Sequence, residues 1–189
     1  MNNIIARIAL AFAVILSPAA FAGEYEDTIA SFKAADETAA FFGDAYAYVV
    51  FPTIGKGGIG IGGAYGEGRV YEQGNYVGNT DMGQVTIGFQ LGGQAYSQVI
   101  FFQDKRAFDE FTSGRFEFGA EASAVALTAG ANAKAGTTGH TAGASGGKNN
   151  STNVSAWYKG MMIFTIAKGG LMYEASIGGQ KFSYTPLGE

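Results

Sequence analysis

The sequence predicts a mostly β fold of the α+β class: a strongly curled antiparallel sheet or small barrel, with an N-terminal helix and one short inserted helix. Three observations predict it. Apolar residues alternate with polar residues or glycine along several segments, as in strands with one buried face. Apolar residues recur at steps of three and four near the N-terminus and over residues 104–112. One long stretch has glycine at nearly every second position, which lets a sheet bend sharply.

Residues 1–22 have the three parts of a secretory signal peptide. Arg7 supplies the basic start, Ile8–Leu16 the short apolar core and Ala20–Ala22 the cleavage site. The apolar run is shorter than the roughly 20 residues that span a bilayer. We therefore expect one domain over residues 23–189 in the periplasm, free or peripheral on a membrane. The alternative is an uncleaved N-terminal anchor.

Composition argues against several classes of function. The chain has no cysteine, and its one histidine, His140, lies in a polar segment. No cluster of histidines or carboxylates has metal-site spacing, and no nucleophile has a visible base, so we expect no enzyme, no cofactor and no metal. The formal net charge is −4, and loss of Arg7 with the signal peptide makes it more negative. Nucleic acid is therefore not an expected partner, because it calls for a basic stripe.

Residues 24–44 are predicted to form one helix. Ile29, Phe32 and Phe42 recur at helical spacing. Acidic residues open the segment, where the helix dipole favours them. The apolar face either packs on the domain or presents Phe32, Phe41 and Phe42 to a lipid or a partner.

The rest of the chain is predicted as strands and one helix. Pro52 is expected to end the first strand, because proline cannot donate to a ladder. Asp104 is the expected N-cap of the inserted helix. Residues 121–135 are interpreted as a strand of small side chains, with a helix as the rival, and residues 137–153 as a polar loop. The predicted strands are Ala45–Phe51, the glycine-rich strand over 58–71, Met82–Leu91, Tyr96–Phe102, Val154–Lys159, Met161–Ala167, Leu171–Ile177 and Lys181–Thr185.

The glycine-rich stretch over residues 55–68, GKGGIGIGGAYGEG, contains a formal G-x-G-x-x-G match. A dinucleotide-binding loop needs a helix directly after it, and strand-like residues follow instead, so nucleotide binding is not expected. At period two, the even positions from 58 to 68 are glycine except for Ala64, so one face of this strand lacks side chains. Such a face fits either tight packing on a curled sheet or a narrow apolar slot for an acyl chain.

Three cations, Lys56, Arg69 and Lys168, lie beside glycines. Lys56 and Lys168 each occupy a Lys-Gly-Gly corner between apolar segments, and the two corners resemble each other. At these corners the cations could contact a lipid phosphate together with free backbone N–H groups, or face solvent as ordinary corner residues. The candidate lipid-binding residues are Phe32, Phe41, Phe42, Lys56, Arg69 and Lys168.

Two blocks of the sequence resemble the SYLF domain family. The first, VVFPTIGKGGIGIGGAYGEGRVY over Val49–Tyr71, has a strand, an FP corner, a lysine and a glycine ladder. The second, FFQDKRAFDEFTSGRFEFGAEASA over Phe101–Ala124, has a strand, a short helix and a Gly-Ala-x-Ala-Ser segment. The resemblance covers residues 46–177 and implies a non-enzymatic domain that binds anionic phospholipids; some eukaryotic members also bind actin. The chain departs from the family in lacking a basic N-terminal segment and a Gly-Pro-rich stretch after Ser123.

We therefore expect a non-enzymatic lipid-binding domain of the cell envelope, contacting anionic phospholipid through an apolar helix or slot and corner lysines. Phospholipid or a membrane surface is the expected partner. Actin is not, because the signal peptide directs the chain out of the cytoplasm. Two alternatives stay open: a small outer-membrane β-barrel, which alternating strands fit, and an envelope protein-interaction module. The sequence does not predict an oligomeric state.

Overall fold

The computed structural model describes residues 18–119, 122, 124–127, 157–170 and 177–188. Several expectations lie outside these residues: the start and core of the signal peptide, the polar loop with His140, most of the 121–135 segment, the start of the 154–159 strand and the 171–177 strand up to its last residue. The helices are α1 (Pro18–Lys33), α2 (Asp36–Ala39), α3 (Phe41–Asp44) and α4 (Lys105–Thr112). The strands are β1 (Ala47–Glu72), β2 (Asn75–Phe102), β3 (Val125–Leu127), β4 (Met161–Gly170), β5 (Lys181–Phe182) and β6 (Thr185–Pro186).

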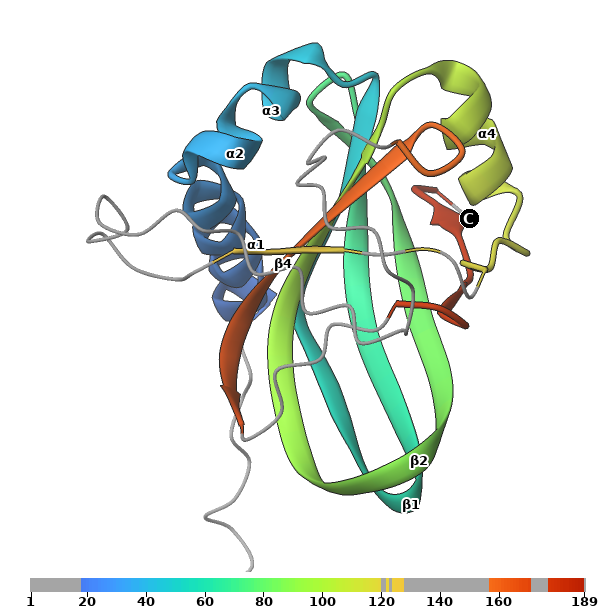
Figure 1. Cartoon of the computed structure of the whole chain (residues 1–189). Coiled ribbons are helices and arrows are strands. Elements are labelled where there is room, and N and C mark those ends of the chain that lie inside the picture. Colours follow the sequence, from blue (N-terminus) through green and yellow to red (C-terminus); the bar gives the residue numbers. More distant parts are fainter. Residues whose placement is uncertain (1–17, 120–121, 123, 128–156, 171–176, 189) are drawn as a thin grey trace, which may run out of the picture.

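The prediction of a single helix over residues 24–44 is wrong, because the chain forms three helices there. The break comes at Ala35, whose ψ of 124° is extended. The Thr38 hydroxyl donates to the carbonyl oxygens of Phe32 and Ala35, and so ties α2 to the last turn of α1. Because of the break, α1, α2 and α3 lie one after another along one side of the sheet (Figure 1).

The prediction of an inserted helix after Asp104 is confirmed. The Asp104 carboxylate accepts a hydrogen bond of 2.8 Å from the backbone N–H of Ala107 at the start of α4. This N-cap satisfies one of the donors that a helix start leaves unpaired. Phe108 and Phe111 are buried, as the helical spacing predicts.

β1 and β2 form one long antiparallel hairpin. β1 has 26 residues and β2 has 28. Gln73 and Gly74 join them with φ of 49° and 81°, which are the positive values that a type I′ hairpin turn needs. The expected strand end at Pro52 is wrong: β1 continues through it. The ladder shifts register between Phe51 and Ile54, so Pro52 sits in a bulge, where proline is tolerated.

The remaining strands add to β2. The strand order is β1-β2-β4-β3, and β5 and β6 pair with the first part of β2. β3 runs parallel to β4, so the sheet is mixed where an antiparallel one was expected. In the part of the chain that the structure describes, no ladder joins β1 to β3, so the expected barrel does not close. The expected strong curl is also absent, because the change of direction is concentrated in one bend of the hairpin.

The hairpin doubles back on itself near its middle (Figure 1). We call residues 58–62 of β1 with 86–92 of β2 the bend. The register passes from the Ile59–Leu91 pair to the Ile61–Ile87 pair, so Gly60 alone on β1 is matched by residues 88–90 on β2. β2 follows the wider turn, and its extra residues supply the longer path. A Cβ on Gly58 would lie 2.3 Å from the Cα of Gly62, so the inner turn depends on that glycine.

Side chains from the first part of β1 cover the glycine face in its second part. We call residues 47–57 of β1 the first arm and residues 63–72 the second arm. A Cβ on Gly66 would lie 2.6 Å from Cγ1 of Ile54, and one on Gly68 would lie 2.7 Å from the ring of Phe51. Tight packing therefore explains the bare face at these positions. The alternative, a slot for an acyl chain, is wrong at these two positions, because Ile54 and Phe51 occupy the space.

Two apolar clusters lie on opposite faces of the sheet. One lies between the arms, α4 and the C-terminal strands, and includes Phe51, Phe102, Phe111 and Phe182. The other lies between the sheet and α1–α3. Period-two alternation sends neighbouring residues of one strand to different clusters, so the ends of β1 and β2 near the helices are apolar on both faces.

We expect Gly66→Ala to lower the free energy of unfolding by about 1–3 kcal/mol, the usual cost of overpacking, because its Cβ would lie 2.6 Å from Ile54. Gly55→Ala is the matched control: it lies on the same strand, and a Cβ there meets nothing within 4 Å. The control should keep the stability of the wild type or raise it by up to about 1 kcal/mol, because alanine loses less backbone entropy in a strand than glycine does. Urea denaturation of both variants measures the difference, and equal effects would contradict the packing of the arms.

Candidate functional site

The six residues expected to bind lipid do not form one site. Phe32 is fully buried in the cluster beneath α1. Phe41 and Phe42 are partly buried, and their rings lie 5.4 and 4.9 Å from that of Phe101. In this arrangement the apolar face of the helical segment packs on the sheet. Lys56, Arg69 and Lys168 lie in three different environments.

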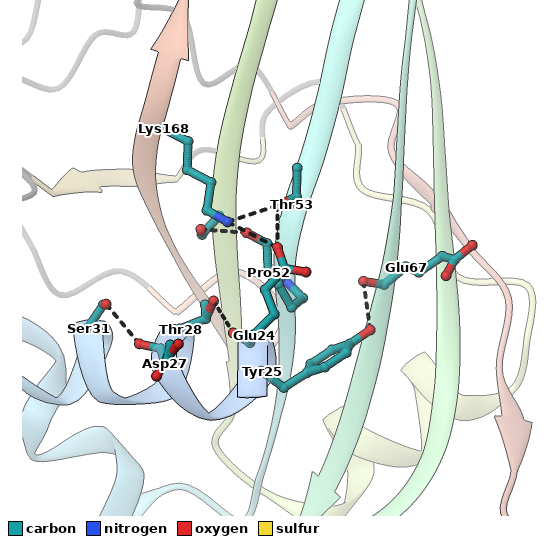
Figure 2. Close-up of polar contacts among 10 residues, drawn as sticks. Glu24, Tyr25, Asp27, Thr28, Ser31, Pro52, Thr53, Glu67 and Lys168 are labelled. Atoms are coloured by element: carbon teal, nitrogen blue, oxygen red, sulfur yellow. Dashed lines mark hydrogen bonds and ion pairs between the residues drawn. The ribbon is translucent and has the colours of Figure 1, made fainter. Parts of the chain in front are cut away.

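Lys168 belongs to a polar cluster that joins α1, β1 and β4 (Figure 2). Its Nζ donates to Oγ1 of Thr53 at 2.8 Å and lies 3.3 Å from Oε1 of Glu24. The Thr53 hydroxyl also lies 2.8 Å from the same carboxylate oxygen. Glu24 therefore neutralises Lys168, and this lysine has less charge to offer a lipid headgroup than an unpaired one.

Arg69 is held between two aromatic rings. Its Cζ lies 4.2 Å from the ring centroid of Tyr25 and 5.0 Å from that of Tyr76, within the range of cation–π contacts. The Tyr25 hydroxyl donates to the carbonyl oxygen of Glu67 at 3.3 Å (Figure 2). Burial raises the pKa of Tyr25 to about 12, against the opposing effect of Arg69.

Consecutive residues in the middle of α1 thus contact both arms of β1. Glu24 reaches Thr53 on the first arm, and Tyr25 reaches Glu67 and Arg69 on the second. We call these contacts the latch. The latch holds α1 against the doubled hairpin. Its two residues also contact two of the three predicted cations: Glu24 pairs with Lys168, and the Tyr25 ring lies against Arg69.

Lys56 differs from the other two cations because it faces inward. Its side chain is 5% exposed, and it is the one charged residue among the buried polar residues of the described chain. Within those residues its Nζ has no hydrogen-bond partner. The sequence placed Lys56 at a corner but could not reveal this burial, because burial depends on the return of the second arm.

The outward face near the bend carries exposed apolar side chains that are not among the candidate lipid-binding residues. Ile61 is 70% exposed, Val85 76% and Tyr65 55%. The ladder places Val85 beside Gly63 and Tyr65 beside Gly83, so the two strands present these side chains together. The bend projects away from the helices (Figure 1). Alternation with glycine was the available signal, but it does not tell which face is covered.

The sequence around the bend has no charged residue over 57–66 or 82–103. The nearest acidic side chains on the outward face are Glu67 and Asp81, which the ladder pairs. The Tyr65 hydroxyl lies 3.1 Å from Glu67 and 3.2 Å from Asp81. Tyr65 therefore lies between the apolar residues of the bend and the acidic pair Glu67 and Asp81.

A network of buried amides lies between the arms and the C-terminal segment. The Gln98 amide donates to Gln180 at 3.1 Å, and the Gln180 amide donates to the Tyr96 hydroxyl at 3.1 Å. The Gln84 amide donates to the carbonyl oxygen of Gly178 at 2.8 Å. Burial raises the pKa of Tyr96 to about 12, partly offset by the hydrogen bond from Gln180.

A surface pocket of about 390 Å³ lies between α3 and the turn that joins β1 to β2. Phe42, Ala45, Tyr46 and Tyr48 contribute to its lining. The Nζ of Lys33 lies 5.3 Å from the ring centroid of Phe42. In Figure 1, α3 lies at the opposite end of the fold from the bend.

A family model described as "Ysc84: Las17-binding protein actin regulator" matches residues 83–184, more than half of the chain. The chain belongs to this family, which is also called SYLF. The match begins on β2 beside the bend and ends just after β5. The resemblance seen in the sequence is therefore confirmed.

A curated relative is Beta cell expansion factor A from Aeromonas veronii. It is 30% identical over 92 residues, which make up 49% of this chain and 28% of the relative. The chain therefore aligns with less than a third of that protein's length.

Two further features bear on function. Among the helices of the described residues, none is both long and apolar enough to cross a bilayer. The same residues contain no group of three or more histidines, cysteines or carboxylates placed to hold a metal ion.

We expect the free energy of unfolding to fall as pH rises from 10 toward 12. Tyr96 has a pKa of about 12 when folded and 10.0 ordinarily, so the unfolded chain loses this proton first and gains stability relative to the native state. Tyr96→Phe removes this contribution, so the drop between pH 9 and pH 11 should be smaller by about 1 kcal/mol. Urea denaturation at the two pH values tests this, and an identical drop in both proteins would contradict it.

Proposed function

We propose that this protein is a non-enzymatic lipid-binding domain of the cell envelope that meets a membrane through the outward face of its hairpin bend. The observation that supports this most is the gathering of Ile61, Tyr65 and Val85, all exposed, on a projecting segment without charged residues. Exposed apolar residues that cluster mark interaction sites more often than isolated ones do.

The expected strength of this contact fits reversible membrane binding. Ile61 and Val85 are 70% and 76% exposed, so most of their apolar surface is available for burial. Two aliphatic side chains would contribute on the order of 3–6 kcal/mol, which corresponds to a dissociation constant between several millimolar and some tens of micromolar. Tyr65 would lie at the headgroup level, where aromatic residues with a polar end are favoured.

The bend is a better candidate than the helical segment. Phe32 is buried, and the latch holds α1 in place, so lipid contact through that helix would first require α1 to leave the sheet. The bend needs no rearrangement. Because Glu67 and Asp81 stand behind the tip, we expect apolar insertion to dominate over attraction to anionic lipid. Recognition of an anionic headgroup would fall to Lys56, the one predicted cation with neither an ion pair nor an aromatic partner in the described structure.

Periplasmic location and the absence of actin as a partner remain part of this proposal. Both rest on the signal-peptide pattern of residues 1–22. The family description names an actin regulator, but an exported chain would not meet cytoplasmic actin.

We expect the purified protein to co-sediment with phosphatidylcholine vesicles, and to bind vesicles containing phosphatidylglycerol about equally at low and high salt. Ile61→Asp combined with Val85→Asp should lose most of the binding, because two carboxylates would have to enter the apolar layer. Leu187→Asp is the matched control, since Leu187 is also exposed, at 51%, but lies near the C-terminus. If the double variant binds like the wild type, the bend is not the contact. Absence of binding by the wild type to both vesicles would contradict the lipid proposal and favour a protein partner.

A second measurement uses the absence of cysteine in the chain. Val85→Cys, labelled with an environment-sensitive dye, should show a blue shift when phosphatidylcholine vesicles are added. The same dye on Leu187→Cys should not. Equal responses from the two positions would contradict insertion of the bend.

A further inference from the structure

Lys56 lies in an inward-facing row of residues just above the bend. Its ladder partner on β2 is Gln94, and Ala64 on the second arm has Gln84 as its ladder partner. Where the two arms of β1 face each other, Gly66 lies against Ile54 and Gly58 lies against Gly62. Lys56 and Ala64 are midway between these two pairs, so they lie opposite each other. The row that crosses the fold is therefore Gln94, Lys56, Ala64 and Gln84, all of them buried.

In the next two rows, a large side chain from the first arm fills the space over a glycine. Ile54 packs on Gly66, and Phe51 packs on Gly68. Lys56 takes the equivalent position over Ala64, and it is the one member of this series with a charge. A packing role alone would suit an aliphatic residue better, because lysine is rarely buried unless it is paired.

The described residues offer Lys56 no counter-charge. The ion pairs among them involve other cations, including Lys168 with Glu24 and Lys181 with Glu117. Glu67 and Asp81, which flank the bend, are exposed on the outward face and not on the face of Lys56. The neighbouring Gln94 carries a buried Oε1 that also lacks a partner in the described part of the chain. A buried ammonium without compensation is strongly unfavourable.

We propose that Lys56 is the centre of an internal anion site, which takes a carboxylate or phosphate group through its Nζ. A protonated oxygen of a phosphate would also donate to Oε1 of Gln94 and so satisfy both unpaired atoms, whereas a carboxylate, which carries no proton, would pair with Lys56 alone. The residue opposite Lys56 on the second arm is Ala64, whose side chain is a single methyl group. The site lies at the end of the fold that the proposed membrane contact uses. If the anion is a lipid headgroup, the inference rests on the proposed lipid function; if it is a free anion, the inference stands alone.

The test is thermal unfolding of the full protein in chloride, inorganic phosphate, octanoate and dioctanoyl phosphatidic acid at matched ionic strength. At a concentration about 100 times the dissociation constant, the binding anion should raise the wild-type Tm by roughly 5–10 °C. Lys56→Met keeps the length of the side chain and removes the charge, so its Tm should not respond to that anion. Lys168→Met is the matched control and should respond as the wild type does.

The site itself predicts a second result. In chloride alone, Lys56→Met should have a higher Tm than the wild type, because an uncompensated buried charge is removed. If Lys56→Met does not fold, Lys56→Gln is the substitute, since glutamine already occupies both ends of the row. A wild type that responds to none of the anions, or an Lys56→Met variant that responds equally to them, would overturn the site. In the first case Lys56 is satisfied within the protein, for example by Gln94.

The pattern of response identifies the source of the anion. A response to phosphatidic acid or octanoate without one to inorganic phosphate supports a lipid headgroup, and the reverse supports a free anion. Failure of the two proposals can be told apart. If the wild type ignores vesicles but its Tm responds to phosphate through Lys56, the lipid function fails and the internal site stands. If Lys56→Met and the wild type behave alike in every anion while both bind vesicles, the internal site fails alone.

Discussion

The fold depends on the contact between the two arms of β1. Side chains of the first arm, Ile54 and Phe51, lie against Gly66 and Gly68 of the second at distances that leave no room for a Cβ. Each glycine within a strand costs about 0.5–1 kcal/mol relative to alanine, and burial of a large apolar side chain contributes about 1.5–3 kcal/mol. The exchange is favourable only because the hairpin doubles back. The bend, the longer outer path of β2 and the inward rows all follow from this contact.

The doubling back of β1 also places an apolar surface and a buried cation at the same end of the molecule. Period-two alternation sends Lys56 inward, to a row of glutamines, and sends Ile61 and Tyr65 outward, to solvent. An apolar surface and a buried cation are thus a few residues apart on one strand, but on opposite faces. α1 adds the latch, which holds both arms through Glu24 and Tyr25. A membrane contact on the outward face and an anion site on the inward face are compatible, because neither uses the residues of the other.

Local signals predicted some elements well. Asp104 as an N-cap and the spacing of Phe108 and Phe111 were enough for α4, because capping and helical periodicity act within a few residues. The glycine face of β1 was also visible from alternation. The predicted continuous helix over 24–44 failed at Ala35 and Thr38, since the break depends on how the segment packs on the sheet. The strand end predicted at Pro52 was wrong for a similar reason. A bulge accommodates this proline, and the bulge depends on the register between β1 and β2.

The sequence by itself determined the family, the mostly β composition and the bare face of β1. These follow from residue type and period, which need no knowledge of distant contacts. Only the tertiary structure decided what fills the glycine ladder, which cations are paired and where apolar surface remains. Lys56 and Lys168 occupy similar corners in the sequence, yet one is buried without a partner in the described chain and the other forms an ion pair with Glu24. The difference arises because burial and pairing depend on segments that meet only when the hairpin folds back and α1 docks on it.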